Sequence, residues 1–131
     1  MSKLIAVQDF SYALSDQSDL TITATILLTG IPSIVNKVNG LGFCLDGFTL
    51  QVTNVKTVSA TIPDPGPYNA SFSATALKVK DLSEGKLVLR IGDKTGVIHA
   101  TPNIPGSPNT PEPVTFTITI TNSGQNFVFA N

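Results

Sequence analysis

The chain has 131 residues, of which 41% are hydrophobic and 13% are charged, and its formal net charge is −1. Charged residues make up roughly 25% of a typical soluble domain, so Ser, Thr, Asn and Gly must supply most of the polar surface. The basic residues form no run that could neutralise phosphates, which excludes a nucleic-acid-binding stripe. One domain over 1–131 is expected. Its low charge favours a subunit of an assembly, although an ordinary neutral β domain has the same balance.

The sequence also restricts where the protein is assembled. No apolar stretch approaches the length of a membrane span, so no stable membrane insertion is expected. Gln8 and Asp9 stand where a secretory signal needs an unbroken apolar run. Cys44 is the only cysteine, which excludes an internal disulfide and favours a reducing compartment. We therefore expect assembly in the cytoplasm without a signal peptide, and any extracellular destination must be reached by another route.

Thr alternates with aliphatic residues along much of the chain, which is the pattern of half-buried β-strands. In 19–29 the even positions are apolar and the odd positions are mainly Thr, and the same alternation is cleanest in 114–121. Further strands are predicted at 48–53, 58–62, 70–80 and 87–91, and Phe127 and Phe129 close the chain. The pattern predicts an all-β fold, namely a compact antiparallel sandwich, a barrel or a conical β-prism-like domain.

Prolines and a change of parity interrupt the strands. The prolines of 63–67 predict an exposed connection, and those of 101–113 predict a long, semi-rigid Pro-rich loop or arm. Apolar residues move from even to odd positions around Ala76, which predicts a bulge or bend there. Only 10–15 and 33–38 are candidates for a helical turn.

Few residues could carry chemistry. His99 is the only histidine, so neither a nucleophile and base pair with Cys44 nor a metal site of three or four ligands is indicated within one chain. Metal ligation by His99 or Cys44 across subunits stays open. Carboxylates such as Asp46, Asp64 and Asp93 lie beside Gly or Pro, where Asp favours turns. Because Trp is absent and only two Tyr are present, neither a hydrolase nor a lectin is positively indicated, and no cofactor is expected.

The stretch 85–93 is the most distinctive string in the chain. On physical grounds it is a turn Gly, a strand with Lys86 and Arg90 on the face opposite Leu87 and Ile91, and a Gly-Asp turn. It resembles the motif that names the PAAR-repeat spike-tip family, in which a Gly-Lys pair leads into a small-residue strand ending in Arg, an aliphatic residue, Gly and Asp. The matching residues are Gly85, Lys86, Arg90, Gly92 and Asp93, with Ile91 as a conservative match. Leu87, Val88 and Leu89 depart from the motif, because they replace its Pro-Ala-Ala core.

Residues 74–80 and 104–108 are also similar to PAAR-like proteins of phage-tail-derived contractile injection systems. The resemblance implies a small conical β domain that caps and sharpens a trimeric spike, and that in some members anchors effector cargo. Members that bind zinc near the apex use several histidines with a cysteine. This chain has one histidine and one cysteine, so the metal is not carried over.

We therefore expect a non-enzymatic structural component of a phage-tail-like contractile injection particle, first of all a PAAR-like spike tip that binds the spike trimer or other particle subunits. Such a tip would reach the extracellular side on delivery. The alternative is another virion protein, such as a trimeric capsid decoration protein whose proline arm, 101–113, lies across a neighbouring subunit. A carbohydrate-active enzyme is a remote alternative that rests on the acidic turn residues alone.

Overall fold

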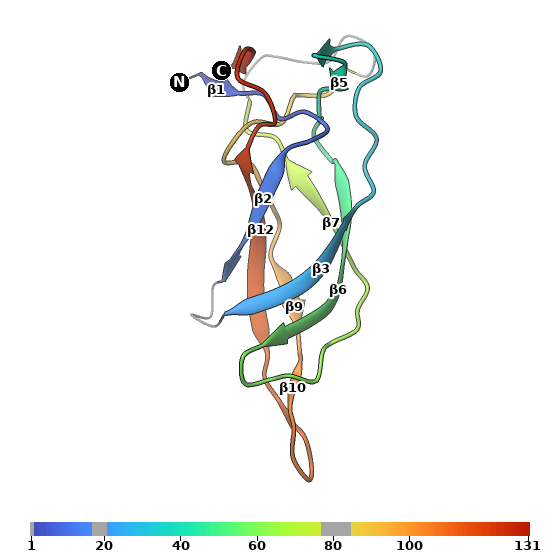
Figure 1. The fold of residues 1–131 in the computed structure, drawn as a ribbon, viewed down its shortest axis with the longest axis vertical. Coiled ribbons are helices and arrows are strands. Elements are labelled where there is room, and N and C mark those ends of the chain that lie inside the picture. Colours follow the sequence, from blue (N-terminus) through green and yellow to red (C-terminus); the bar gives the residue numbers. More distant parts are fainter. Residues whose placement is uncertain (1, 17–20, 77–84) are drawn as a thin grey trace.

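The computed structural model describes residues 2–16, 21–76 and 85–131, and within these ranges it contains strands and turns but no helix. Its main strands are β2 (Ser11–Asp16), β3 (Ile22–Leu28), β6 (Thr49–Thr57), β7 (Tyr68–Ser73), β8 (Lys94–Thr95), β9 (Ile98–Ala100) and β12 (Val114–Asn122). They form one antiparallel sheet of order β2-β12-β8-β7-β6-β3, with β9 beside β12. The sheet curls into a nearly closed barrel (Figure 1).

Alternation of Thr with aliphatic residues gives each strand one face inside the barrel. In β3, the aliphatic residues at even positions are half-buried and the residues between them are exposed. In β12, Phe116 and Ile118 have no exposed surface. These observations confirm the all-β prediction and the strands expected at 19–29 and 114–121, except that residues 19 and 20 lie outside the described ranges.

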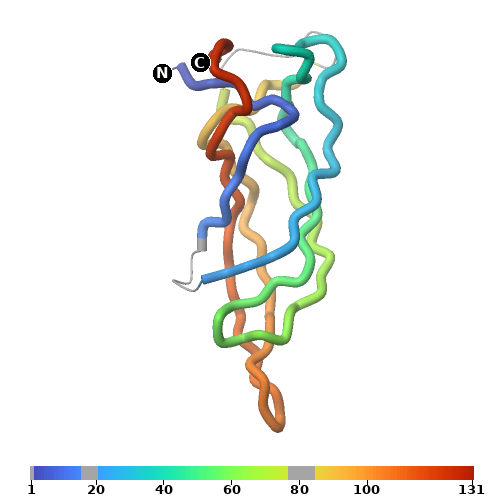
Figure 2. Tube along the Cα trace, in the orientation of Figure 1, coloured from blue at the N-terminus to red at the C-terminus, as the bar shows by residue number. Residues whose placement is uncertain are grey.

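The molecule is long and tapers from a broad end to a pointed end (Figures 1 and 2). The hairpin of β10 (Asn103–Ile104) and β11 (Thr110–Pro111) forms the pointed end. At the broad end, β1 (Lys3–Leu4) pairs with β13 (Phe129–Ala130), and β4 (Lys37–Val38) pairs with β5 (Leu41–Gly42). Both chain termini lie there (Figure 1).

The chain runs along the barrel in three successive strand pairs (Figure 2). The first pair is β2 and β3, and the second is β6 and β7. In the third pair, the first strand is divided into β8 and β9, and the second strand is β12. In each pair, the chain runs away from the broad end and then returns to it. Every neighbouring pair in the sheet is antiparallel, so β2 and β3, at its two ends, also run in opposite directions. The strand pairs therefore repeat one architectural unit three times.

The barrel is filled by one large apolar cluster with an aromatic centre. The ring of Phe10 meets Phe48 and Phe72 edge-on, with centroids 5.7 and 5.4 Å apart, which is the arrangement that aromatic pairs prefer. A smaller apolar cluster, which includes Ile5 and Val88, lies at the broad end. No described segment forms a helix with the length and apolar character that crossing a membrane requires.

Several local predictions are wrong. Residues 10–15 lie mostly in β2, and 33–38 include β4, so neither is a helical turn. The strand expected at 58–62 is a connection in which Val58 is 80% exposed. The preceding strand is longer than expected because Asn54, with a φ of 53°, switches the parity inside β6 and lets Val55 and Thr57 face inward.

The two remaining irregularities differ in outcome. Residues 101–113 do not form an unbroken loop, since Asn103 pairs with Pro111 and Ile104 with Thr110. A proline at an edge position of a strand needs no N–H in the ladder, so the prolines are compatible with this hairpin. The bulge expected near Ala76 falls next to residues 77–84, which lie outside the described ranges, and β7 has already ended at Ser73.

Candidate functional site

Three segments of similar conformation meet at the broad end, 4–10, 42–48 and 87–93, and we call them the cap segments. Ala6 donates its backbone N–H to the carbonyl of Leu89 at 2.8 Å, Leu89 donates to Cys44 at 2.9 Å, and Cys44 donates to Ala6 at 2.9 Å. This ring of hydrogen bonds closes on itself, as three equivalent units around an axis do. The cap segments are therefore related by pseudo-three-fold symmetry within one chain.

A second set of hydrogen bonds obeys the same symmetry. It consists of Gln8 N–H to Gly42 at 3.0 Å, Asp46 N–H to Leu87 at 2.8 Å, and Ile91 N–H to Leu4 at 3.1 Å. The antiparallel bridges are equivalent as well: Ile5 with Arg90, Phe43 with Val7, and Val88 with Leu45. Because donors and acceptors keep the same offset in all three segments, the symmetry extends over the whole width of the cap.

Each cap segment ends in a tight turn that feeds the first strand of its pair. The closing hydrogen bonds run from Phe10 N–H to Val7 at 2.8 Å, from Phe48 to Leu45 at 3.0 Å and from Asp93 to Arg90 at 3.1 Å. The second and third turns place Gly47 and Gly92 at φ values of 86° and 93°, where a side chain is strained. The first turn has Asp9 at that position, without a positive φ, so its backbone geometry differs.

The distinctive motif of the sequence occupies the third cap segment. Arg90 stands where the other two segments have Val7 and Leu45, and Asp93 stands where they have Phe10 and Phe48, as the shared register shows. Both charged residues are buried, with 6% and 1% of their surface exposed. The structure thus substitutes a polar arrangement for apolar packing in one of three equivalent positions.

Asp93 and Arg90 are linked through backbone groups and one hydroxyl. The Asp93 carboxylate accepts the N–H of Arg90 at 2.8 Å and the hydroxyl of Thr75. The Arg90 guanidinium donates to that same hydroxyl oxygen at 2.9 Å and to the carbonyl of Ala130 at 3.2 Å. The pair therefore connects the third cap segment to the residues after β7 and to the C-terminal strand.

The prediction that 87–91 is a regular alternating strand with Arg90 on its outer face is wrong. Val88, Leu89 and Arg90 are buried in succession, because this segment crosses the end of the barrel and is covered from both sides. Ile91 is half-buried, and Gly85 has a φ of 70°. The turn expected at Gly92 and Asp93 is confirmed.

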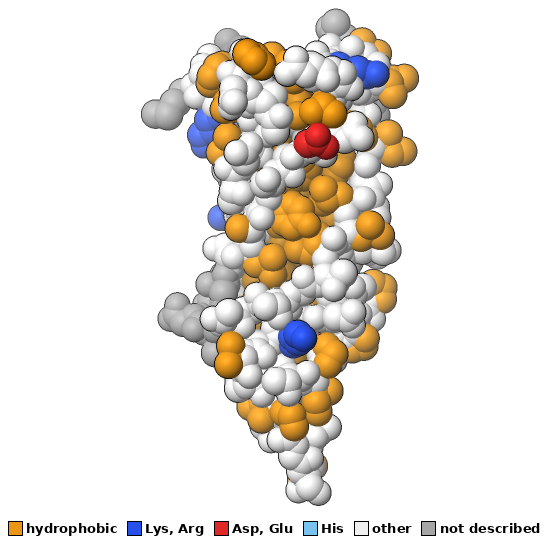
Figure 3. All heavy atoms as spheres, viewed as in Figure 1, with side chains coloured by type: hydrophobic (Ala, Val, Ile, Leu, Met, Phe, Trp, Pro, Cys, Tyr) orange, Lys and Arg blue, Asp and Glu red, His pale blue; other side chains and the backbone are white. Residues whose placement is uncertain are grey.

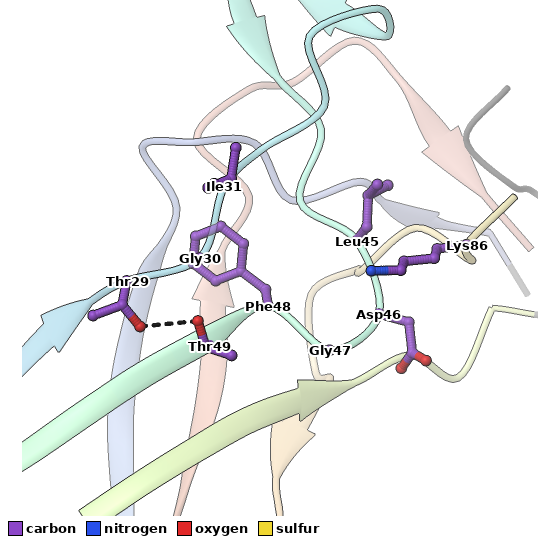
Figure 4. A pocket seen from close by; sticks show the side chains of 9 residues that line it. All are labelled: Thr29, Gly30, Ile31, Leu45, Asp46, Gly47, Phe48, Thr49 and Lys86. Carbon is purple, nitrogen blue, oxygen red and sulfur yellow. Dashed lines mark hydrogen bonds between the residues drawn. The ribbon is translucent and has the colours of Figure 1, made fainter. Parts of the chain in front are cut away.

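Lys86, the remaining motif residue, lines a pocket of about 290 Å³ beside the second cap segment (Figure 4). Its wall holds Phe48 against Gly30, where a Cβ would come within 2.5 Å of the phenyl ring. Beside them, Thr29 donates its hydroxyl to Thr49 at 2.9 Å (Figure 4). The Asp46 carboxylate accepts the N–H of Ala74 at 2.8 Å. It is the one carboxylate among the described residues that line the pocket, so these residues supply no carboxylate pair of the kind that acid and base catalysis uses.

His99 and Cys44 are in different environments. His99 is exposed on β9, whereas Cys44 is fully buried in the ring of cap hydrogen bonds, so the structure does not bring the two together. Burial raises the pKa of the Cys44 thiol to about 12, which leaves it protonated and unreactive near neutrality. Among the described residues, no three His, Cys, Asp or Glu side chains gather as a metal site.

Asp64 has a structural setting near the pointed end. Its carboxylate accepts the N–H of Thr101 at 2.8 Å, the N–H of Gly66 at 3.1 Å and the hydroxyl of Tyr68. Burial raises the pKa of Asp64, but the hydrogen bonds from Thr101, Tyr68 and Gly66 outweigh it and lower the pKa below its ordinary value. The hydrogen bond from the Tyr68 hydroxyl to Asp64 is also the main cause that raises the pKa of Tyr68 to about 12. The carboxylates of Asp64 and Asp93 therefore accept N–H groups of their own turns, whereas that of Asp46 accepts the N–H of Ala74, which is distant in sequence.

Large apolar side chains are exposed beside the cap segments. Ser33 donates its N–H to Phe43, and Ile5 donates to Val128, so the segments 31–36 and 125–131 both lie against cap segments. These two segments carry most of the large apolar side chains that are exposed on the described residues: Ile31, Ile34, Val35, Phe127 and Phe129. We call these five residues the base patch.

Sequence reasoning identified the motif but missed the symmetry of the cap. The available signal was three short triplets, each followed by turn residues and a strand: 5–7, 43–45 and 88–90. The first two triplets are apolar but the third ends in Arg90, and the three share no residue at equivalent positions, so only their shared hydrogen-bond register exposes the repeat. Comparison of the chain with protein-family models, with curated proteins and with solved structures finds no match.

Proposed function

We propose that this protein is the non-enzymatic spike tip of a phage-tail-like contractile injection particle, and that its broad end caps a trimeric spike. The pseudo-three-fold cap carries the proposal. A single chain that binds on a three-fold axis meets three identical surfaces. A chain whose own end repeats three times around an axis can present a comparable backbone contour to each of them, so the cap matches the symmetry of such a partner.

The shape of the molecule supports the same orientation. Its strands run between the broad and pointed ends, and the narrow hairpin of β10 and β11 lies opposite the cap (Figure 1). An axial push on the broad end is then transmitted along strands that are cross-linked by backbone hydrogen bonds. The pointed hairpin would lead and the cap would stay on the spike. No chemical step is needed for this role.

The base patch supplies apolar surface for docking. Ile31 is 82% exposed, Phe127 is 71% exposed and Phe129 is 56% exposed, and exposed apolar groups that gather at one end of a protein mark interaction surfaces. Burying aromatic side chains in a partner contributes strongly to binding. The similarity of 85–93 to the PAAR motif supports the proposal independently, since the motif residues Arg90 and Asp93 hold the third cap segment in place.

Co-purification with the trimeric spike protein of the same particle tests this proposal. We expect the full-length chain to be retained by the tagged spike trimer and Phe127→Asp to weaken retention by tenfold or more, which corresponds to about 1.4 kcal/mol. Val58→Asp is the matched control, because Val58 is 80% exposed but lies in the connection near the pointed hairpin, where Ile62 bridges Asn103. A stable monomer that ignores the trimer, or a control variant that loses retention equally, contradicts the proposal.

The alternative of a capsid decoration protein makes a different prediction about mass in solution. A trimeric decoration protein is a homotrimer by itself, whereas a tip whose three-fold axis lies inside one chain is a monomer until it meets the spike.

We propose cytoplasmic assembly, extracellular exposure after delivery and carriage of effector cargo as parts of the spike-tip role. Retained turnover after combined substitution of Asp46, Asp64 and Asp93 would leave an enzymatic role without a site.

A further inference from the structure

The first strand pair differs from the other two. In the second pair β6 is hydrogen-bonded to β7, and in the third pair β9 is hydrogen-bonded to β12. Among the described residues, no backbone pairing joins β2 to β3, which are the two end strands of the sheet. We call the opening between β2 and β3 the seam. The seam interrupts the barrel. At the two equivalent positions of the pseudo-three-fold repeat, the two strands of the pair are hydrogen-bonded to each other.

Both walls of the seam are free strand edges. Thr29 donates its N–H to Thr49 at 3.0 Å, and alternate residues of an antiparallel strand bond to the same neighbour, so Leu27 also faces β6. The N–H and C=O groups of Ile26 and Leu28 are thereby directed into the seam. Among the described residues, no strand pairs with this side of β3, so these groups form a free sheet edge.

The same alternation applies to β2. Ile120 of β12 exchanges backbone hydrogen bonds with Gly92 and Asp93, on the side away from β2. The β12 residues that bond to β2 are therefore the threonines between the isoleucines, and their partners are Ala13 and Ser15. The main-chain groups of Tyr12 and Leu14 remain for the seam.

The floor of the seam is apolar. The inward residues of β12 are buried, but those of the two end strands are only half-buried. These half-buried residues are Tyr12, Leu14, Ile22, Ala24, Ile26 and Leu28. Figure 3 shows hydrophobic side chains exposed down the middle of the face that Figure 1 shows between β2 and β3. None of the six inward residues named above is charged, so this part of the floor selects apolar groups and not charge.

We propose that the seam is an acceptor site for one extended segment of another polypeptide, with apolar side chains at every second position. Two facing main-chain edges are complementary to a β-strand, which is the mode of recognition called β-strand addition. Alternate side chains of the inserted segment would meet the floor, while the others point to solvent. Because β2 and β3 run in opposite directions, the segment is antiparallel to one wall and parallel to the other. This site does not depend on the proposed role of the cap.

Hydrogen exchange of the full-length protein with a strand-forming probe tests the proposal. The probe is a synthetic peptide with the sequence of β12, Val114–Asn122, whose apolar residues alternate with Thr, and the control is a peptide of the same composition in which that alternation is scrambled. We expect the alternating peptide to bind saturably and to slow exchange of the Ile26, Leu28, Tyr12 and Leu14 amides. Absence of protection, or equal protection by the scrambled peptide, overturns the proposal.

Two substitutions at adjacent positions locate the effect. Ile26→Thr introduces a hydroxyl on the half-buried inner face of β3, and Leu27→Thr introduces the same group on its outer face, where Leu27 is 60% exposed. We expect roughly tenfold weaker peptide binding for the first variant and unchanged binding for the second, with circular dichroism confirming that both are folded. Should Ile26→Thr fail to fold, the exchange pattern of the unmodified protein decides alone. Protection of the seam that rises with protein concentration in the absence of peptide would show that a second copy fills it, and would overturn the proposal.

Discussion

The broad and pointed ends of the molecule are held together in different ways. At the broad end, closed rings of backbone hydrogen bonds join the three cap segments, and Arg90 and Asp93 are buried within the third. At the pointed end, β10 and β11 pair through two residues each, and every residue of 105–111 is exposed. Stability is therefore concentrated where the proposed partner binds, and the leading hairpin contributes little to it. Substitutions at the two ends should differ accordingly.

The largest effect is expected for Asp93→Ala. Its carboxylate accepts hydrogen bonds from Arg90 and Thr75 and is 1% exposed, so its removal leaves buried donors unsatisfied. We expect a loss of about 3 kcal/mol in the free energy of unfolding, measured by urea denaturation. Asp9→Ala, at an exposed turn position of the first cap segment, is the control and should change stability by less than about 0.5 kcal/mol. Equal effects of the two variants would contradict the structural role of Asp93.

The polar pair can also be compared with its apolar counterparts. Arg90→Leu combined with Asp93→Phe would restore the residue types found at Leu45 and Phe48 in the second cap segment. Because a buried charge left alone costs more than a missing pair, the double variant should be less destabilised than the sum of the two single variants. Additive losses in thermal unfolding would show that Arg90 and Asp93 act independently.

A smaller effect is expected at the turn glycines. Gly47 and Gly92 adopt positive φ values, and a Cβ at Gly47 would meet no atom within 4 Å, so substitution there costs backbone strain alone. We expect Gly47→Ala and Gly92→Ala each to lower stability by about 1–2 kcal/mol. Asp9→Gly should not raise it, since the first turn has no positive φ. A neutral Gly47→Ala would mean that the second turn is not strained as described.

Asp64 links the middle of the barrel to the pointed end, and its substitution should have an intermediate to small effect on the free energy of unfolding. In Asp64→Asn, the pKa of Tyr68 should fall from about 12 toward its ordinary value of 10.0, as followed by ultraviolet absorbance of the tyrosinate. A Tyr68 pKa that is unchanged would contradict the hydrogen bond between the two side chains.

The same pair predicts two pH dependences of stability. The pKa of Asp64 is lower in the folded protein than its ordinary value of 3.8, so its contribution is complete above that value and is lost as the pH falls through the folded pKa. The pKa of Tyr68 is raised, so its contribution is complete below pH 10.0 and is lost as the pH rises toward 12. Asp64→Asn should flatten both slopes in urea denaturation series.

The smallest effect is expected at the pointed hairpin. Replacement of the exposed residues 105–109 by Asn-Gly keeps a two-residue turn after the pair Ile104 and Thr110. Thermal unfolding should show a change of less than about 0.5 kcal/mol. A large loss would mean that the pointed end supports the fold, and would remove the contrast between the two ends.

The sequence predicts the strands better than their closure. Alternating Thr and aliphatic residues are a local signal, so β3 and β12 could be identified from the chain alone. The burial of Arg90 could not, because its segment is covered by two others that are distant in sequence. The end of β6 could not be predicted either, since the positive φ of Asn54 extends the strand without a change in apolar composition. The pseudo-three-fold ring is formed by backbone groups, which leave no residue signature.

The stoichiometry of the complex with the spike tests the central claim most directly. A chain with its three-fold axis inside one copy must bind a trimeric spike as a single subunit. Native mass spectrometry of the complex isolated from particles should therefore give one copy of this chain for every three spike chains. Three copies per spike trimer, or a homotrimer of this chain without the spike, would contradict the account.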